Sequence, residues 1–292
     1  MTVREAKQLA SSFHRISSPT EEDVFLYTEA LQFLINETKD ASYMMELGGY
    51  YYGQRQFDLA LKYYELGSEY HSPIADECLG YIWYYGRTGV RDYEKAFRYF
   101  SKAAERGNLV ASYKLADMYK NGYYVEKSYG KYKQIIEELY PKVCCSDWLG
   151  DPLPEIFTRL ARIRAEEGKT DEAVTLYRSA KTFLSQRIEY NDFFGNLNIM
   201  MWLVDDLYTL TPFDAESFDL FDLYWLLKAP CTVRFYHHAK SCAVTVTEEE
   251  DELVIRFEGS CYRNREDFFK KACIGSEKLT SLYGELYGFE ME

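Results

Sequence analysis

Apolar residues along the first two thirds of the chain recur at intervals of three and four residues, which is the spacing of one face of an α-helix. Glycines interrupt this pattern where the first helix of a pair must end, at Gly53, Gly86, Gly122 and Gly168. Each interruption is followed by a second apolar stretch with helical spacing. The pattern therefore predicts a series of helical hairpins over residues 39–188.

The hairpins share a repeated pattern, which begins with a leucine and a small residue in each of four copies: Leu47-Gly48, Leu79-Gly80, Leu115-Ala116 and Leu160-Ala161. The second helix has three recurring positions, at 13, 17 and 20 residues after the leucine in the first and fourth copies. The second and third copies have them at 17, 21 and 24 residues, so four residues are added between their helices. One hairpin cannot bury its apolar face alone, so the four copies must stack.

The second copy closely resembles a Sel-one-like repeat over residues 75–107, with matches at Ala75, Leu79-Gly80, Trp83, Gly86, Asp92-Tyr93, Lys95-Ala96, Tyr99-Phe100, Ala103-Ala104 and Gly107. The first and fourth copies resemble tetratricopeptide repeats. The third keeps the first-helix pattern but has Lys131-Tyr132 in place of the Lys-Ala step. The resemblance implies an α-solenoid of four hairpins, and it implies an adaptor scaffold that binds other proteins.

The sequence pattern of residues 1–38 predicts a helical cap at the start of this array. The segment Ser18-Pro19-Thr20-Glu21 has the residue types of a helix start, with Ser18 as the N-cap and Pro19 at the first helical position. Apolar positions then predict a helix to about Asn36. A terminal element of this kind covers apolar surface that the first repeat would otherwise expose.

Residues 189–292 predict a separate α+β module. Helices are expected at 199–204, 220–227, 264–272 and 279–287, and strands that alternate apolar and polar residues are expected at 231–237, 243–247 and 253–257. The three strands predict an antiparallel meander. The fold class is therefore mostly α, an α-solenoid followed by a small module with a three-stranded antiparallel sheet.

The composition of the 292 residues excludes some classes of partner. Asp and Glu outnumber Lys and Arg by 47 to 34, a formal net charge of −13, and residues 190–292 hold 19 acidic and 9 basic residues, a net −10. This argues against nucleic acid and anionic membranes, which attract clustered basic side chains. Seven cysteines cannot all pair, and no apolar run is long enough to span a membrane, so we expect a cytoplasmic protein that is a monomer or a weak homo-oligomer.

Candidate catalytic or metal-binding residues are few. The chain has four histidines and lacks the common phosphate-binding, hydrolase and zinc-protease motifs, so we expect no cofactor, no metal and no enzymatic activity. The alternative is an enzyme or metal-binding protein with its site in the C-terminal module and the repeats recruiting substrate. Its residues would be Cys231, His237, His238, Cys242 and Cys261. Because the two histidines are adjacent on a predicted strand, their side chains are expected on opposite faces.

The tetratricopeptide resemblance also implies which residues face a partner. In that family the first helices of the hairpins line the concave face of the array. The corresponding residues here are Met45, Tyr52, Glu77, Tyr81, Tyr84, Tyr85, Tyr113, Asp117, Lys120, Asn121 and Arg162. Tyrosine, of which the chain has 28, offers a rigid ring with a polar hydroxyl. We therefore expect a tyrosine-lined groove that binds a protein or an extended peptide.

Overall fold

The computed structural model describes residues 1–144, 152–190, 194–250 and 252–292. The chain divides into two compact units, Met1–Leu139 and Tyr140–Glu292. Their boundary lies within helix α8 (Tyr129–Cys144). The second unit therefore contains the fourth hairpin together with the C-terminal elements. No helix in the described part of the chain is both long and apolar enough to cross a membrane.

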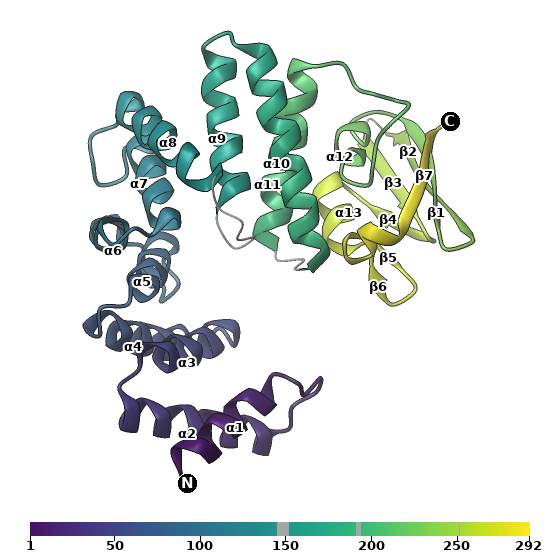
Figure 1. The fold of residues 1–292 in the computed structure, drawn as a ribbon. Coiled ribbons are helices and arrows are strands. Elements are labelled where there is room, and N and C mark those ends of the chain that lie inside the picture. Colours follow the sequence, from purple (N-terminus) through teal and green to yellow (C-terminus); the bar gives the residue numbers. More distant parts are fainter. Residues whose placement is uncertain (145–151, 191–193, 251) are drawn as a thin grey trace. The chain divides into compact units, whose positions relative to one another are not determined.

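The first unit is a succession of helical hairpins (Figure 1). Besides α8, its helices are α1 (Val3–Phe13), α2 (Glu21–Thr38), α3 (Ala41–Gly53), α4 (Phe57–Glu69), α5 (Pro73–Tyr85), α6 (Tyr93–Glu105) and α7 (Leu109–Asn121). Within hairpins, α1 packs on α2, α3 on α4 and α5 on α6, and between hairpins α2 packs on α3, α4 on α5 and α6 on α7. This stacking confirms the predicted array of helical hairpins.

The repeat glycines let the two helices of a hairpin come close together. A Cβ on Gly48 would lie 2.6 Å from the ring of Tyr64, and a Cβ on Gly80 would lie 2.5 Å from the ring of Phe100. Both rings are buried, at 4% and 0% exposure. Contacts this short are essentially never seen for real Cβ atoms, so a side chain at either glycine would collide with the ring. Each aromatic ring therefore packs directly against the glycine backbone of the other helix in its hairpin.

Helix α2 begins later than the sequence analysis predicts. Thr20, and not Ser18, is its N-cap: the Thr20 hydroxyl accepts a hydrogen bond from the Asp23 amide at 3.2 Å, and the Asp23 carboxylate accepts one from the Thr20 amide at 2.8 Å. Pro19 therefore precedes the cap. The pairs Ser18–Glu21 and Thr20–Asp23 both have the spacing of a capping box. Thr20 and Asp23 form the capping box, and the Asp23 carboxylate also accepts a hydrogen bond from the Thr20 hydroxyl at 2.6 Å.

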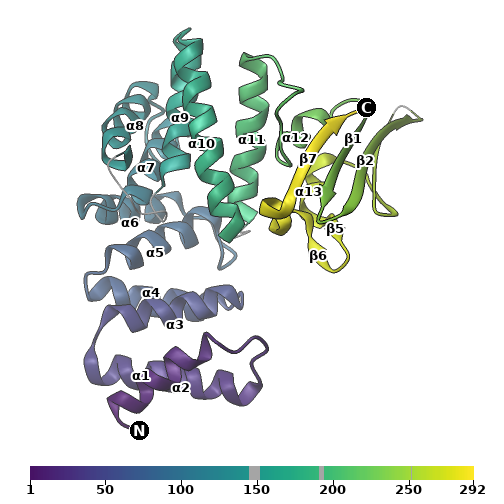
Figure 2. The same ribbon diagram turned by 45° about the vertical axis from the view of Figure 1, so that its right-hand side comes forward.

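The second unit contains the fourth hairpin and the C-terminal elements, which Figure 2 shows from a second direction. Its helices are α9 (Leu153–Glu166), α10 (Thr170–Tyr190), α11 (Phe194–Leu210), the short α12 (Leu223–Leu226) and α13 (Arg265–Lys271). Helix α10 packs against α9, against α11 and against the 3₁₀ helix η1 (Leu279–Glu285). The helix predicted over 220–227 is thus only one turn long.

The sheet of the second unit is larger than predicted. Its five strands have the order β4-β3-β2-β1-β7, all antiparallel: β1 (Cys231–His237), β2 (Lys240–Glu249), β3 (Glu252–Phe257), β4 (Ser260–Tyr262) and β7 (Leu286–Met291). The predicted meander is its centre, β1 to β3. Two short strands, β5 (Cys273–Ile274) and β6 (Glu277–Lys278), form a separate ribbon.

The helix predicted over 279–287 was wrong. Residues 279–285 form the 3₁₀ helix η1, in which Leu279 and Leu282 are buried three residues apart, as a 3₁₀ turn requires. The chain then extends into β7, whose Leu286 is paired with His237 of β1. The predicted segment is therefore helical only over 279–285, as a 3₁₀ helix, and the pairing of β7 with β1 ends it.

Candidate protein-binding face

Three of the predicted partner-facing residues lie together on α5. Tyr81, Tyr84 and Tyr85 stand three and four residues apart, so the helix places them on neighbouring surface positions. Helix α5 ends directly after them because Gly86 adopts a left-handed conformation with φ 64°. The cluster therefore lies at the C-terminal end of α5, where this helix packs beside α7.

Tyr81 and Tyr113 fill space between α5 and α7. Their hydroxyls are hydrogen-bonded to each other at 3.2 Å, and the Tyr81 ring meets Phe100 edge-on with centroids 5.5 Å apart. Tyr113 is only 6% exposed. Burial, and then the neighbouring Tyr113, raise the pKa of Tyr81 well above its ordinary value. These two predicted contact residues are thus part of the packing between first helices.

Tyr84 is half-buried in an aromatic cluster. Its ring lies edge-on to Tyr93, Tyr123 and Phe100, with centroid distances of 5.5, 5.9 and 6.2 Å. Burial raises its pKa, and the charge of Asp117 adds to the shift. One edge of the ring remains accessible, so Tyr84 combines packing with a partly exposed surface.

Tyr85 is the exposed member of the group, at 42% exposure. Its ring is parallel to that of Tyr81, with centroids 5.9 Å apart and an interplanar angle of 2°. Two cations lie over it: the Arg87 guanidinium is 5.1 Å from the ring centroid, and Lys114 Nζ is 5.9 Å from it. Cations at these distances are attracted by the ring face.

The same two cations connect further tyrosines. Arg87 Nε donates a hydrogen bond to the Tyr52 hydroxyl at 3.0 Å, and Lys114 Nζ lies 5.1 Å from the ring centroid of Tyr113. Tyr52, Arg87, Tyr85, Lys114 and Tyr113 thus form a continuous row from α3 across α5 to α7, which we call the cation–tyrosine row. The sequence analysis missed Arg87 and Lys114, since both stand outside the inward positions of the family pattern.

The polar residues predicted for this face have partners inside the first unit. The Glu77 carboxylate accepts a hydrogen bond from Asn108 Nδ2 at 2.7 Å, and burial raises its pKa although that bond and the Lys114 charge oppose the rise. Asn121 is exposed and donates to the Asp117 carbonyl at 2.8 Å. Two further members make packing contacts. Lys120 Nζ lies 4.8 Å from the centroid of Tyr132, and Met45 packs against the buried cluster around Leu79.

A shallow hollow of about 420 Å³ adjoins the row at Arg87. It is lined by the turn between α3 and α4, the start of α4 and the residues after α5: Arg55, Gln56, Phe57, Asp58, Leu59, Arg87 and Thr88. The Arg87 guanidinium lies 6.0 Å from the Phe57 ring centroid at this edge. Two arginines and one aspartate therefore line the hollow beside an aromatic ring.

Arg162, the remaining predicted contact, belongs to the second unit. Its Nε donates to Asp206 Oδ2 of α11 at 2.6 Å, and its guanidinium lies 5.8 Å from the Trp202 ring centroid. Tyr177 also donates to Asp206, at 3.1 Å. Arg162 thus takes part in packing between α9, α10 and α11.

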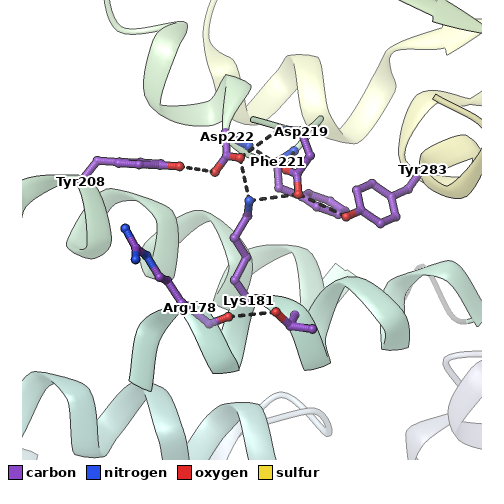
Figure 3. Close-up of polar contacts among 8 residues, drawn as sticks. Arg178, Lys181, Tyr208, Asp219, Phe221, Asp222 and Tyr283 are labelled. Atoms are coloured by element: carbon purple, nitrogen blue, oxygen red, sulfur yellow. Dashed lines mark hydrogen bonds and ion pairs between the residues drawn. The ribbon is translucent and has the colours of Figure 1, made fainter. Parts of the chain in front are cut away.

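Figure 3 shows a largely buried polar cluster in the second unit. Lys181 Nζ of α10 lies 2.9 Å from Asp219 and 2.6 Å from Asp222, while Tyr208 of α11 and Tyr283 of η1 donate to these carboxylates. Burial lowers the pKa of Lys181, but the two carboxylate charges outweigh it and the net shift is upward. Because these contacts run between α10, α11, η1 and the segment before α12, the cluster joins α10 to the C-terminal elements.

The thiols of the alternative catalytic site are poorly suited to nucleophilic chemistry. Burial raises the pKa of Cys231, which is half-buried, and of Cys242, which is 1% exposed. The reactive form of cysteine is the thiolate, and a raised pKa reduces its population at neutral pH. Cys261 is exposed on β4.

Comparisons with known proteins identify the fold. Neither a protein-family model nor a curated protein sequence matches the chain. Among solved structures, a Sel1 repeat protein from Oxalobacter formigenes aligns over 77% of this chain and 92% of its own, with a TM-score of 0.52 and 18% identity. At such identity the likeness shows the fold alone.

Two other solved structures align more loosely. One is a protective antigen of uropathogenic Escherichia coli with an SLR fold, with a TM-score of 0.49, 20% identity and 70% of this chain aligned. The chain spans only 41% of that protein's length. The other is a tetratricopeptide repeat protein from Parabacteroides merdae, with a TM-score of 0.43, 14% identity, and coverage of 73% of this chain and 81% of that one.

The stacked hairpins define the chain as an α-solenoid repeat protein. Its fold is similar to that of the Sel1 repeat protein that aligns with it, in agreement with the sequence resemblance, and the hairpins are followed by a C-terminal antiparallel sheet.

Proposed function

We propose that the chain is a non-catalytic adaptor that binds a protein partner through an extended segment laid across the first helices α3, α5 and α7. The cation–tyrosine row supports this proposal most directly. It spans three successive hairpins, and it presents an exposed ring, Tyr85, between two cations. Rigid aromatic side chains with a polar edge give large contact area for little loss of conformational entropy.

The charges along the row favour a partner segment with acidic groups beside apolar ones. Arg55 and Arg87 line the hollow at one end, and Lys114 lies over the rings further along. A carboxylate of the partner would bind a guanidinium in a bidentate manner, while a neighbouring apolar group would cover the Tyr85 ring. The overall negative charge of the chain makes this basic, aromatic row distinctive.

The test uses peptides selected on the purified protein from a displayed random library, with affinities measured by calorimetry. Tyr85→Ala removes an exposed ring, and we expect it to weaken binding by about 1 to 4 kcal/mol, as loss of an interface aromatic does. Tyr70→Ala is the matched control, because Tyr70 is 43% exposed at the end of α4 and takes no part in the row. The proposal would be overturned if the two substitutions changed peptide affinity equally, or if the selected peptides bound the Tyr85→Ala variant as tightly as the wild type.

We also propose that the adaptor has a reducing, cytoplasmic location and that it is a monomer or a weak homo-oligomer. The described cysteines Cys78, Cys144, Cys231, Cys242, Cys261 and Cys273 are all unpaired. Free thiols persist where glutathione and thioredoxin keep them reduced. Fluorescence imaging of a tagged chain and analytical ultracentrifugation test the two statements.

A further inference from the structure

Two imidazoles and one carboxylate converge at the end of the sheet in the second unit. The Nε2 atoms of His237 and His238 each lie 3.2 Å from the same oxygen, Oε2 of Glu285. The three ligand atoms all lie within 4.8 Å of one another, and among the described residues this is the only such group of three His, Cys, Asp or Glu side chains. The cysteines that the sequence analysis grouped with these histidines are not part of it.

The expectation that His237 and His238 point to opposite faces was wrong, because His238 is not in a strand. It lies in the two-residue turn between β1 and β2, with a left-handed φ of 51°. A left-handed residue leaves the alternation of strand side chains, and its ring comes to lie 4.2 Å from that of His237. One adjacent pair of histidines thus offers two nitrogens to one point.

The third ligand is placed by the pairing of β1 with β7. His237 is paired with Leu286, so the preceding residue, Glu285, stands beside the turn. The Tyr287 hydroxyl donates a hydrogen bond to the His238 carbonyl, and the Tyr287 ring stacks on Tyr236. These contacts fix the backbone of the turn against β7.

The distances fit a metal ion with short bonds. In a tetrahedral Zn²⁺ site with bonds of about 2.0 to 2.1 Å, neighbouring ligand atoms are roughly 3.3 Å apart. Two of the three separations here are 3.2 Å. Imidazole nitrogen with one carboxylate oxygen is a ligand set that suits zinc and its neighbours and not magnesium or calcium, which prefer oxygen alone.

We propose that His237, His238 and Glu285 bind a divalent transition-metal ion of the Zn²⁺ class, with water completing the coordination. His238 and Glu285 have side chains 75% and 51% exposed, so an ion reaches the site directly from solvent. The ion would join the β1–β2 turn to the segment that leads into β7. Because it binds only the folded arrangement, it would stabilise the C-terminal module by mass action.

The proposal is tested on the full chain, stripped with a chelator that is then removed. Calorimetric titration with zinc chloride should show saturable binding of one ion, and magnesium chloride should show none. Glu285→Gln and His238→Gly should each weaken zinc binding by more than the roughly tenfold that loss of a second-shell group costs. Glycine is chosen at position 238 because it tolerates the left-handed backbone.

His14→Ala is the matched control, since His14 also contacts a glutamate, Glu46, at 3.0 Å but has no second histidine beside it. It should leave zinc affinity unchanged. Cobalt(II) absorption reports the ligand type, because thiolate ligands add intense charge-transfer bands that nitrogen and oxygen ligands lack. Thiolate bands, absence of saturable zinc binding, or equal affinity of the Glu285→Gln and wild-type chains would overturn the proposal, provided circular dichroism shows each variant folded.

Discussion

At the scale of single residues, the buried carboxylate of Asp76 links three helices of the first unit. Asp76 of α5 is 0% exposed and accepts a hydrogen bond from Ser68 of α4 at 2.5 Å. It pairs with Lys102 of α6 at 2.9 Å and with Arg106, the C-cap residue of α6, at 3.0 Å. The two cations have side chains 39% and 33% exposed. The charges are therefore buried unequally, and the cost of removing them should be unequal as well.

We predict that removing the cations costs more than removing the carboxylate. The double variant Lys102→Met/Arg106→Met leaves the buried carboxylate with the Ser68 hydrogen bond but without a counter-charge, which typically costs about 3 to 5 kcal/mol. Asp76→Asn leaves cations that water can still reach, and should cost about 1 to 3 kcal/mol. Urea unfolding of both variants gives the comparison. A larger loss for Asp76→Asn would show that the carboxylate is better hydrated than its burial indicates.

At the scale of elements, the contact between glycine and aromatic ring determines how closely each hairpin closes. Gly48 and Gly49 are neighbours in α3, but only Gly48 faces the ring of Tyr64, whereas the nearest atom to a Cβ on Gly49 is 4.0 Å away. Helix propensity favours alanine over glycine by up to about 1 kcal/mol at both positions. Packing opposes the substitution by alanine only at Gly48, where the Tyr64 ring occupies the space of the new methyl group.

We therefore predict opposite signs for two adjacent substitutions. Gly48→Ala should destabilise by about 1 to 3 kcal/mol, because the new methyl displaces the Tyr64 ring, and Gly49→Ala should stabilise by up to about 1 kcal/mol. Thermal and urea unfolding measure both. Adding Tyr64→Leu should cost less in the Gly48→Ala background than in wild type, since the two side chains compete for one space. Equal changes in the free energy of unfolding for Gly48→Ala and Gly49→Ala would refute the contact between Gly48 and the Tyr64 ring.

The hairpins were predictable from sequence because their signals are local. A leucine, a small residue and a ring at fixed offsets define two helices and their contact without knowledge of the rest of the chain. The cation–tyrosine row was not fully predictable, because Arg87 joins it through a hydrogen bond to Tyr52, which lies 35 residues earlier in the chain. Glu285 was missed for the same reason: it reaches His237 only when β7 pairs with β1, and its own segment has helical spacing.

At the scale of the whole molecule, many tyrosines titrate in environments that disfavour the phenolate. Burial is the largest cause of the raised pKa of Tyr64 and Tyr177, and the Asp206 charge adds to it for Tyr177. Cys78, which is packed beside Tyr64, has its pKa raised to about 12, again mainly by burial. These groups are distributed over both units.

We predict steep loss of stability above about pH 10. A folded-state pKa above the unfolded value means that the unfolded chain loses protons first, so stability is fully present below pH 10 and falls as pH rises. Each such tyrosine contributes up to about 1.4 kcal/mol per pH unit. Urea midpoints measured between neutral pH and pH 11 should fall, and tyrosinate absorbance should rise together with the loss of helical circular dichroism. Ionisation of all tyrosines with the helices intact would contradict this.

The contact between glycine and ring also bears on how such a sequence can evolve. Gly48 and Tyr64 are 16 residues apart, Gly80 and Phe100 are 20 apart, and yet the two pairs make the same contact. The loop between the helices can therefore gain four residues without altering the packing that it connects. Selection would act on each pair as one unit, so that a larger residue at the glycine would persist only beside a smaller ring. An alignment that allows both spacings should recover relatives in which these paired positions change together.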